Sequence, residues 1–209
     1  MRSLFFTLFL AISAAAFAQP KGYAPVADAK LFQQSLGAHT GALQSLQSDF
    51  TQTKVLALLS DKVISKGRFS YRKSDKVRIE YTAPYTYLMV MNAGKVMVRD
   101  EQKTSTMNTK SSKTLQSVNR IMLDCMSGSV FSNPDFRTTA YQSPTGYLLA
   151  MKPATAAMQK LFSGIDVYLD KNYDVQKLVL TEQGGDYTDM VFRGTQRNVA
   201  LNDALFSVR

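Results

Sequence analysis

The stretch that decides the fold spans residues 67–99 and reads GRFSYRKSDKVRIEYTAPYTYLMVMNAGKVMVR. Within it, residues 76–81 alternate strictly between charged and apolar side chains. Because successive side chains of a strand point to opposite faces, Val77, Ile79 and Tyr81 share one face, and three charged residues share the other. This pattern is typical of an antiparallel strand with one buried face.

The neighbouring segments extend this strand into a meander. Residues 66–71 alternate in the same way, and the polar residues 72–75 between the two runs predict a hairpin. Pro84 ends the second strand because proline has no backbone N–H donor. Residues 85–91 are apolar almost throughout, which indicates a third strand covered on both faces. A turn and a fourth strand follow at residues 92–98.

The rest of the chain predicts further strands and two main helices. One helix is expected over residues 26–46, with Phe32, Leu36, Leu43 and Leu46 on one stripe. A central helix is expected to end near Gly128, with Leu115, Val118, Met122 and Cys125 on its apolar face. Further strands are expected at residues 48–53, 104–108, 136–142, 147–151, 165–169, 175–180 and 187–193. The fold class is therefore α+β, with a single antiparallel sheet of about eleven strands that must curl, close or be covered.

The first eighteen residues have the three parts of a secretory signal peptide. Arg2 precedes an apolar run at residues 4–12, and the small-residue site at residues 16–18 follows it. The run is shorter than the roughly 20 residues that span a bilayer, so we expect cleavage after Ala18 rather than a retained anchor. The remaining residues 19–209 are expected to form one domain in the periplasm.

Charge and residue usage restrict the possible functions. The chain has a formal net charge of +9, with 25 Lys and Arg against 16 Asp and Glu. For an exported protein this favours anionic lipid headgroups or an acidic protein partner over nucleic acid. Cys125 is the single cysteine and His39 the single histidine, so the chain offers no internal disulfide, zinc-ligand set or Gly-x-Ser-x-Gly triad. We expect a monomeric binding protein, not an enzyme, with no metal and no cofactor.

Four motifs follow one another in the first half of the chain. They are Phe50-Thr51-Gln52, Gly67-Arg68-Phe69, the alternating strand from Val77 to Pro84, and the turn Ala93-Gly94-Lys95. Together with the export signal and the two helices, this order resembles the LolA family of outer-membrane lipoprotein carrier proteins. The resemblance implies an incomplete, unclosed β-barrel, with helices covering its concave face, that shields the acyl chains of lipoproteins crossing the periplasm.

The expected binding site is the concave face of the curled sheet. Its apolar cavity residues are Phe50, Phe69, Tyr71, Val77, Ile79, Tyr81, Val96 and Val98. The resemblance assigns Leu115, Val118, Met122 and Met126 to a lid. At the hairpin where the family often has Arg-Pro, this chain has Lys73-Ser74, so Lys73 is a candidate lid latch, weaker because lysine lacks the planar fork of arginine. Composition is equally consistent with a packed core and an immobile helix.

Two functional hypotheses remain open at this stage. The first is a carrier that receives acylated lipoproteins or other lipids from an inner-membrane lipoprotein-releasing transporter and passes them to an outer-membrane acceptor. The second is a periplasmic lipid-sensing or regulatory scaffold that binds a protein partner through its basic outer face. That face would consist of Lys66, Arg68, Lys76 and Arg78.

Overall fold

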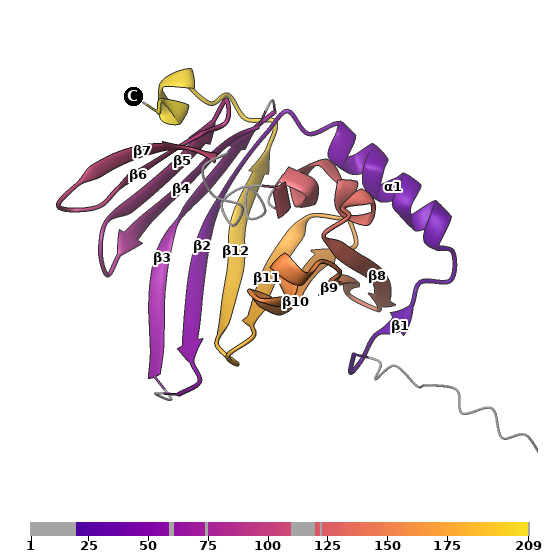
Figure 1. Ribbon diagram of the computed structural model, residues 1–209. Helices are drawn as coiled ribbons and strands as arrows, with labels where there is room; N and C mark the ends of the chain where they lie inside the picture. The colour runs from indigo at the N-terminus through magenta and orange to yellow at the C-terminus, as the bar shows by residue number, and fades with distance from the viewer. Residues whose placement is uncertain (1–19, 59–60, 74, 110–119, 122, 209) are drawn as a thin grey trace, which may run out of the picture.

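The computed structural model describes residues 20–58, 61–73, 75–109, 120–121 and 123–208. Their strands form one antiparallel sheet of twelve members, whose edge strands β1 and β7 lie far apart (Figure 1). In sheet order the strands are β1 (Ala24–Pro25), β8 (Phe136–Ser143), β9 (Gly146–Pro153), β10 (Phe162–Asp170), β11 (Val175–Glu182), β12 (Tyr187–Arg197), β2 (Ser45–Leu56), β3 (Asp61–Arg72), β4 (Lys76–Ala83), β5 (Tyr87–Asn92), β6 (Lys95–Arg99) and β7 (Thr104–Asn108). The expected unclosed barrel is confirmed, and the two-residue strand β1 is the addition to the eleven expected.

The sheet consists of two wings joined by the pairing of β12 with β2. We call β2–β7 the N-terminal wing and β1 with β8–β12 the C-terminal wing. Along the joint the two strands pair from Tyr187 opposite Val55 to Arg197 opposite Leu46, with one register shift between Arg193 and Gln196. The inner faces of the two wings curve toward each other (Figure 1).

The N-terminal helix α1 (Ala29–Gly41) is shorter than the sequence predicts. Asp28 caps it by accepting a hydrogen bond from the Leu31 backbone N–H at 2.9 Å. The expectation that Leu46 continues the helical stripe is wrong, because Leu46 lies in β2 and pairs with Tyr71. Apolar spacing alone could not reveal that β2 finds a strand partner on both sides over most of its length.

The inner face of the C-terminal wing is covered by α1 and the short 3₁₀ helix η2 (Ser129–Ser132). Phe32, Leu36 and Val130 pack there against strand residues such as Met151 and Ile165. A one-turn helix, α3 (Ala156–Gln159), lies in the β9–β10 connection. No described helix has the length and apolar character required to cross a membrane.

The central helix is described in its C-terminal part only. Residues 120, 121 and 123–127 are helical, and Gly128 follows with φ of 72°, a conformation that glycine adopts without steric cost. The predicted lid residues Leu115, Val118 and Met122 lie outside the described residues. Below, "central helix" means the helical residues 120–127 that are described.

The outer face of the N-terminal wing is covered near the chain end by the 3₁₀ helix η3 (Asp203–Phe206). Phe206 is fully buried against Leu88 and Val90 of β5, so this strand is covered on both faces, as its apolar sequence predicts. Lys76 of β4 pairs with Asp203 at 2.6 Å, and Arg78 donates to the Leu205 carbonyl at 3.2 Å. The chain end is thereby fixed on the side of the sheet opposite the central helix (Figure 1).

Candidate binding cavity

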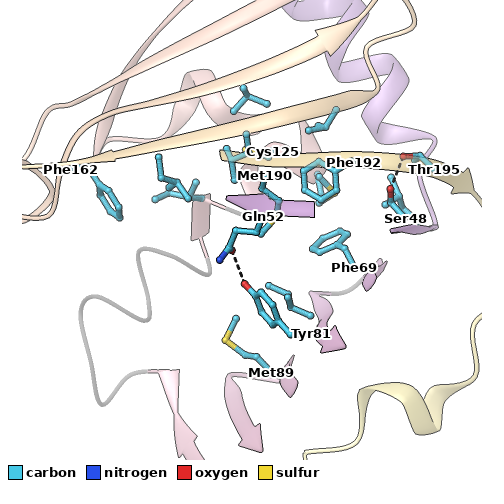
Figure 2. Close-up of a pocket in the computed structure, with 18 residues that line it drawn as sticks. Ser48, Gln52, Phe69, Tyr81, Met89, Cys125, Phe162, Met190, Phe192 and Thr195 are labelled. Atoms are coloured by element: carbon cyan, nitrogen blue, oxygen red, sulfur yellow. Dashed lines mark hydrogen bonds between the residues drawn. The ribbon is translucent and has the colours of Figure 1, made fainter. Parts of the chain in front are cut away.

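A cavity of about 230 Å³ lies between the two wings and the central helix (Figure 2). Residues of seven strands and of this helix line it, and most of them are apolar. They are Leu46, Ser48 and Gln52 of β2, Phe69 of β3, Ile79 and Tyr81 of β4, Met89 of β5, Ile121, Cys125 and Met126 of the helix, Phe162 and Val167 of β10, Val175, Leu178 and Leu180 of β11, and Met190, Phe192 and Thr195 of β12. An apolar space of this kind suits a hydrocarbon chain better than a charged substrate.

The few polar side chains in the cavity wall form two separate pairs. Ser48 and Thr195 share a hydrogen bond of 2.9 Å, and Ser48 also donates to the Arg193 carbonyl at 3.0 Å. The Tyr81 hydroxyl donates to Oε1 of Gln52 at 2.8 Å (Figure 2). Burial, with a smaller contribution from the neighbouring Tyr87, raises the pKa of Tyr81 to about 12, so this hydroxyl stays protonated near neutral pH.

The single cysteine also faces the cavity. Burial, reinforced by the adjacent carboxylate of Asp124, raises the pKa of the Cys125 thiol from 9.0 to about 12. A catalytic cysteine needs a thiolate, which requires a lowered pKa. Burial thus favours the neutral thiol, and Cys125 contributes a small neutral side chain to the cavity wall.

His39 does not belong to the cavity. Its Nε2 lies 3.1 Å from Oδ1 of Asp174, and Arg197 contacts both side chains. Arg197 also donates to the His39 carbonyl at 2.9 Å, so the cluster fixes the C-terminal end of α1 to the C-terminal wing. Across the described ranges, no three His, Cys, Asp or Glu side chains lie close enough together to hold a metal ion.

A family model described as "Outer membrane lipoprotein carrier protein LolA" matches residues 41–209. The chain belongs to the LolA family. The match spans all but one strand of the sheet, and it includes every residue that lines the cavity. The sequence matches no curated protein significantly.

Several solved structures have a similar fold. MucB superposes with a TM-score of 0.51 at 15% identity over 87% of this chain and 63% of its own. A LolA superfamily protein from Nitrosomonas europaea superposes with a TM-score of 0.47 at 8% identity, over 84% of this chain and 97% of its own. The Mycobacterium tuberculosis lipoprotein LppX superposes with a TM-score of 0.45 at 10% identity, over 82% of this chain and 96% of its own. At these identities the likeness concerns the fold.

The cavity and lid residues predicted from the sequence divide into two groups in the structure. Phe69, Ile79, Tyr81 and Met126 line the cavity. The remaining described residues belong to the packed core of the N-terminal wing and are absent from the lining: Phe50, Tyr71, Val77, Val96 and Val98. Val77 and Val96 have no exposed surface at all, so no ligand reaches them in this conformation.

The opposite wall of the cavity was not predicted from the sequence. That wall comes from β10, β11 and β12, through residues such as Val167, Leu178 and Phe192. The alternation of Ile165, Val167 and Leu169 places these three side chains on one face of the expected strand. It gave no sign that Val167 borders a cavity while Ile165 and Leu169 pack against the helical cover.

The central helix is held at its C-terminal end. The Thr40 hydroxyl of α1 donates to the Ser127 carbonyl at 3.0 Å, and the Ser129 hydroxyl donates to Asp124 at 2.7 Å. Lys73, the candidate latch, donates through Nζ to the carbonyl of Gly41 at 3.3 Å. Its contact is thus with the last residue of α1 and not with the described part of the central helix.

The basic outer face is largely engaged within the chain. Arg68 pairs with Asp49 at 3.1 Å in an exposed position. Lys76 and Arg78 bind η3, as described above, and Arg78 also pairs with Glu80 at 3.0 Å. Three of the four predicted cations therefore have intramolecular partners, while Lys66 is exposed to solvent.

Proposed function

We propose that this protein binds the acyl chains of lipoproteins in the cavity between its wings and carries them through the periplasm to the outer membrane. The observation that carries the proposal is the apolar cavity closed by a helix in a chain of the LolA family. Each methylene group removed from water contributes about 0.8 kcal/mol, so a long acyl chain supplies a large driving force. An inner-membrane lipoprotein-releasing transporter would supply the cargo and an outer-membrane acceptor would receive it.

The cavity size indicates how cargo enters. Its volume of about 230 Å³ is below the roughly 300–1,000 Å³ typical of small-molecule pockets. A full acyl chain therefore requires the cover to move. Ile121, Cys125 and Met126 provide that cover from the central helix, which we assign as the lid. Displacement of these three side chains would expose the joint between the wings.

The first experiment identifies the cargo directly. The full chain is expressed with its signal in a Gram-negative periplasm, purified without detergent and analysed by native mass spectrometry. We expect acylated lipoprotein or lipid bound to the wild type. Ile79→Glu and Leu180→Glu place a charge on opposite walls of the cavity, and we expect both to lose this cargo.

A matched control separates binding from folding. Ile64→Glu makes the same change at a position that is 57% exposed and outside the cavity, so it should retain the cargo. Circular dichroism shows whether each variant is folded, and Leu180 is half-buried, which makes its variant the easier to accommodate. Empty wild-type protein that also ignores added triacylated peptide and phospholipid would contradict the carrier proposal.

A second candidate function is the binding of a protein partner. It is favoured by the likeness in fold to MucB, which has also been solved in complex with MucA(peri). Here the contact would use the outer face around Lys66 and Arg68. Binding of this kind would weaken with added salt and need no lipid, which distinguishes it from the carrier function.

A further inference from the structure

The Gln52–Tyr81 pair is held in place by the packing of three neighbouring strands. Gln52 lies on β2 and Tyr81 on β4, and β3 runs between them. Gly67 of β3 pairs with Phe50 on one side and Tyr81 on the other. A side chain at Gly67 would collide with the Phe50 ring, so glycine lets the Phe50 and Tyr81 rings meet edge to face at 5.1 Å. Tyr81 can then reach across β3 to Gln52.

This pair keeps hydrogen-bond donors that none of the described residues uses. A tyrosine hydroxyl offers one donor and a glutamine amide offers two, while the bond between them consumes one. Among the described residues, no acceptor binds Nε2 of Gln52. If the amide group is rotated by 180°, an N–H and the Tyr81 hydroxyl remain instead. In either orientation, donors remain at the wall of an apolar cavity.

The two polar pairs of the cavity differ in this respect. The Ser48 hydroxyl contacts Thr195 and a backbone carbonyl, and Ser48 is only 2% exposed. Gln52 is partly exposed, as are the residues of β2 that follow it. Leu46 and Gln52 are six residues apart, about 20 Å along a strand. The unused donors therefore lie beside the more exposed half of β2, away from the buried Leu46.

We infer that the Gln52–Tyr81 pair binds the carbonyl oxygen at the head of an ester- or amide-linked acyl chain. This inference rests on the proposed carrier function and names the ligand group that the cavity recognises. The hydrocarbon tail would extend from the pair toward Leu46 and Phe69 at the more buried end. A chain attached through an ether lacks the carbonyl, so it leaves the donors unpaired beside hydrocarbon, which is unfavourable. The cavity thus distinguishes acyl chains from alkyl chains of equal length.

Two lysolipids that differ in one carbonyl group test this inference. They are 1-palmitoyl-lysophosphatidylcholine, with an ester, and 1-O-hexadecyl-lysophosphatidylcholine, with an ether. Their affinities for delipidated full-length protein are measured below the micelle concentration by competition with an apolar fluorescent dye. We expect the ester to bind about threefold to tenfold more tightly, the range that one hydrogen bond provides.

Variants of the pair locate the donors responsible. Tyr81→Phe keeps the Gln52 amide, so a preference for the ester should persist. Gln52→Met combined with Tyr81→Phe removes every donor of the pair, so the two lysolipids should then bind equally. Gln47→Met is the matched control, because Gln47 lies on the opposite face of β2 and bonds to Ser70. It should leave both affinities unchanged.

The outcomes separate this inference from the carrier proposal. Binding of both lysolipids with equal affinity by the wild type overturns carbonyl recognition and leaves the carrier function standing. An ester preference that survives in the double variant also overturns it, because the donor then lies elsewhere. If neither lysolipid binds, both the inference and the proposed acyl-chain site fail.

Discussion

The two wings of the sheet bury their inner faces in different ways. The C-terminal wing packs against α1 and η2, with Leu36 only 2% exposed and Met151 fully buried. The inner face of the N-terminal wing has a packed core, but near β12 it borders the cavity under the central helix. One wing is thus a fixed wall built with its own helices. Where this helical cover ends, both wings present apolar side chains to the cavity, such as Leu178 of the C-terminal wing and Ile79 of the N-terminal wing.

The largest expected effect concerns Cys125, at the boundary between the wings. A pKa raised from 9.0 to about 12 lowers the thiolate fraction at pH 8 about a thousandfold. We expect iodoacetamide to alkylate the folded protein at least about a hundredfold more slowly than the chain in denaturant. Mass spectrometry follows a single adduct because the chain has one cysteine. Rates within tenfold of each other would mean that the central helix does not cover this position.

The raised pKa of Cys125 also makes the stability of the folded protein depend on pH. The folded state keeps the Cys125 proton at pH values where the unfolded chain loses it. The free energy of unfolding should therefore fall as the pH rises above about 9, toward 12. The raised pKa of Tyr81 acts in the same direction. Denaturant titrations of Cys125→Ser at a series of pH values would isolate the thiol's share, which should disappear in this variant.

The second prediction tests whether α1 stabilises the C-terminal wing. Phe32 of α1 is 6% exposed and lies against the rings of Phe131, Tyr147 and Tyr173. Phe32→Ala should lower the free energy of unfolding by about 3–5 kcal/mol, as measured by urea denaturation. The adjacent Leu31 is 59% exposed, so Leu31→Ala should change it by less than about 0.5 kcal/mol. Equal losses would show that α1 is not a structural cover.

The smallest expected effect on the free energy of unfolding comes from a comparison of two methionines of β5. Met91 is 4% exposed in the packed core of the N-terminal wing, whereas Met89 is half-buried and lines the cavity. Met91→Ala should lower the free energy of unfolding by about 2–5 kcal/mol, and Met89→Ala by only about 1 kcal/mol. The same urea experiment measures both. If Met89→Ala costs as much as Met91→Ala, the cavity wall is packed as tightly as the core.

The N-terminal wing could be predicted from local sequence in some detail. The strict alternation over Lys76 to Tyr81 predicted the start of β4 and its buried face, because one register buries every apolar side chain, and Pro84 predicted its end. The boundary between α1 and β2 could not be predicted in this way. Leu43 and Leu46 fit a helical stripe, and only the distant partners Tyr71 and Arg197 favour a strand at Leu46.

The cavity was less predictable than the sheet. Alternation tells which side chains point inward, but it does not tell which inward side chains meet a void. Val77 and Ile79 are neighbours on one face, yet Val77 is fully buried and Ile79 reaches the cavity. Gln52 belongs to a motif noted in the sequence, but its role depends on Tyr81, two strands away. The curvature of the sheet decides which inward side chains line the cavity and which of them meet across strands.

The open edges of the sheet have a mechanical consequence. In a closed barrel, strand number and stagger determine the circumference, so the interior has one width. Here β1 and β7 end the sheet at opposite edges, and the wings are connected through a single strand pair in the middle. The angle between the wings can therefore change by twisting at this joint, without the loss of any strand pairing. For the carrier function proposed above, a sheet that opens at this joint would enclose cargo molecules with different numbers of chains.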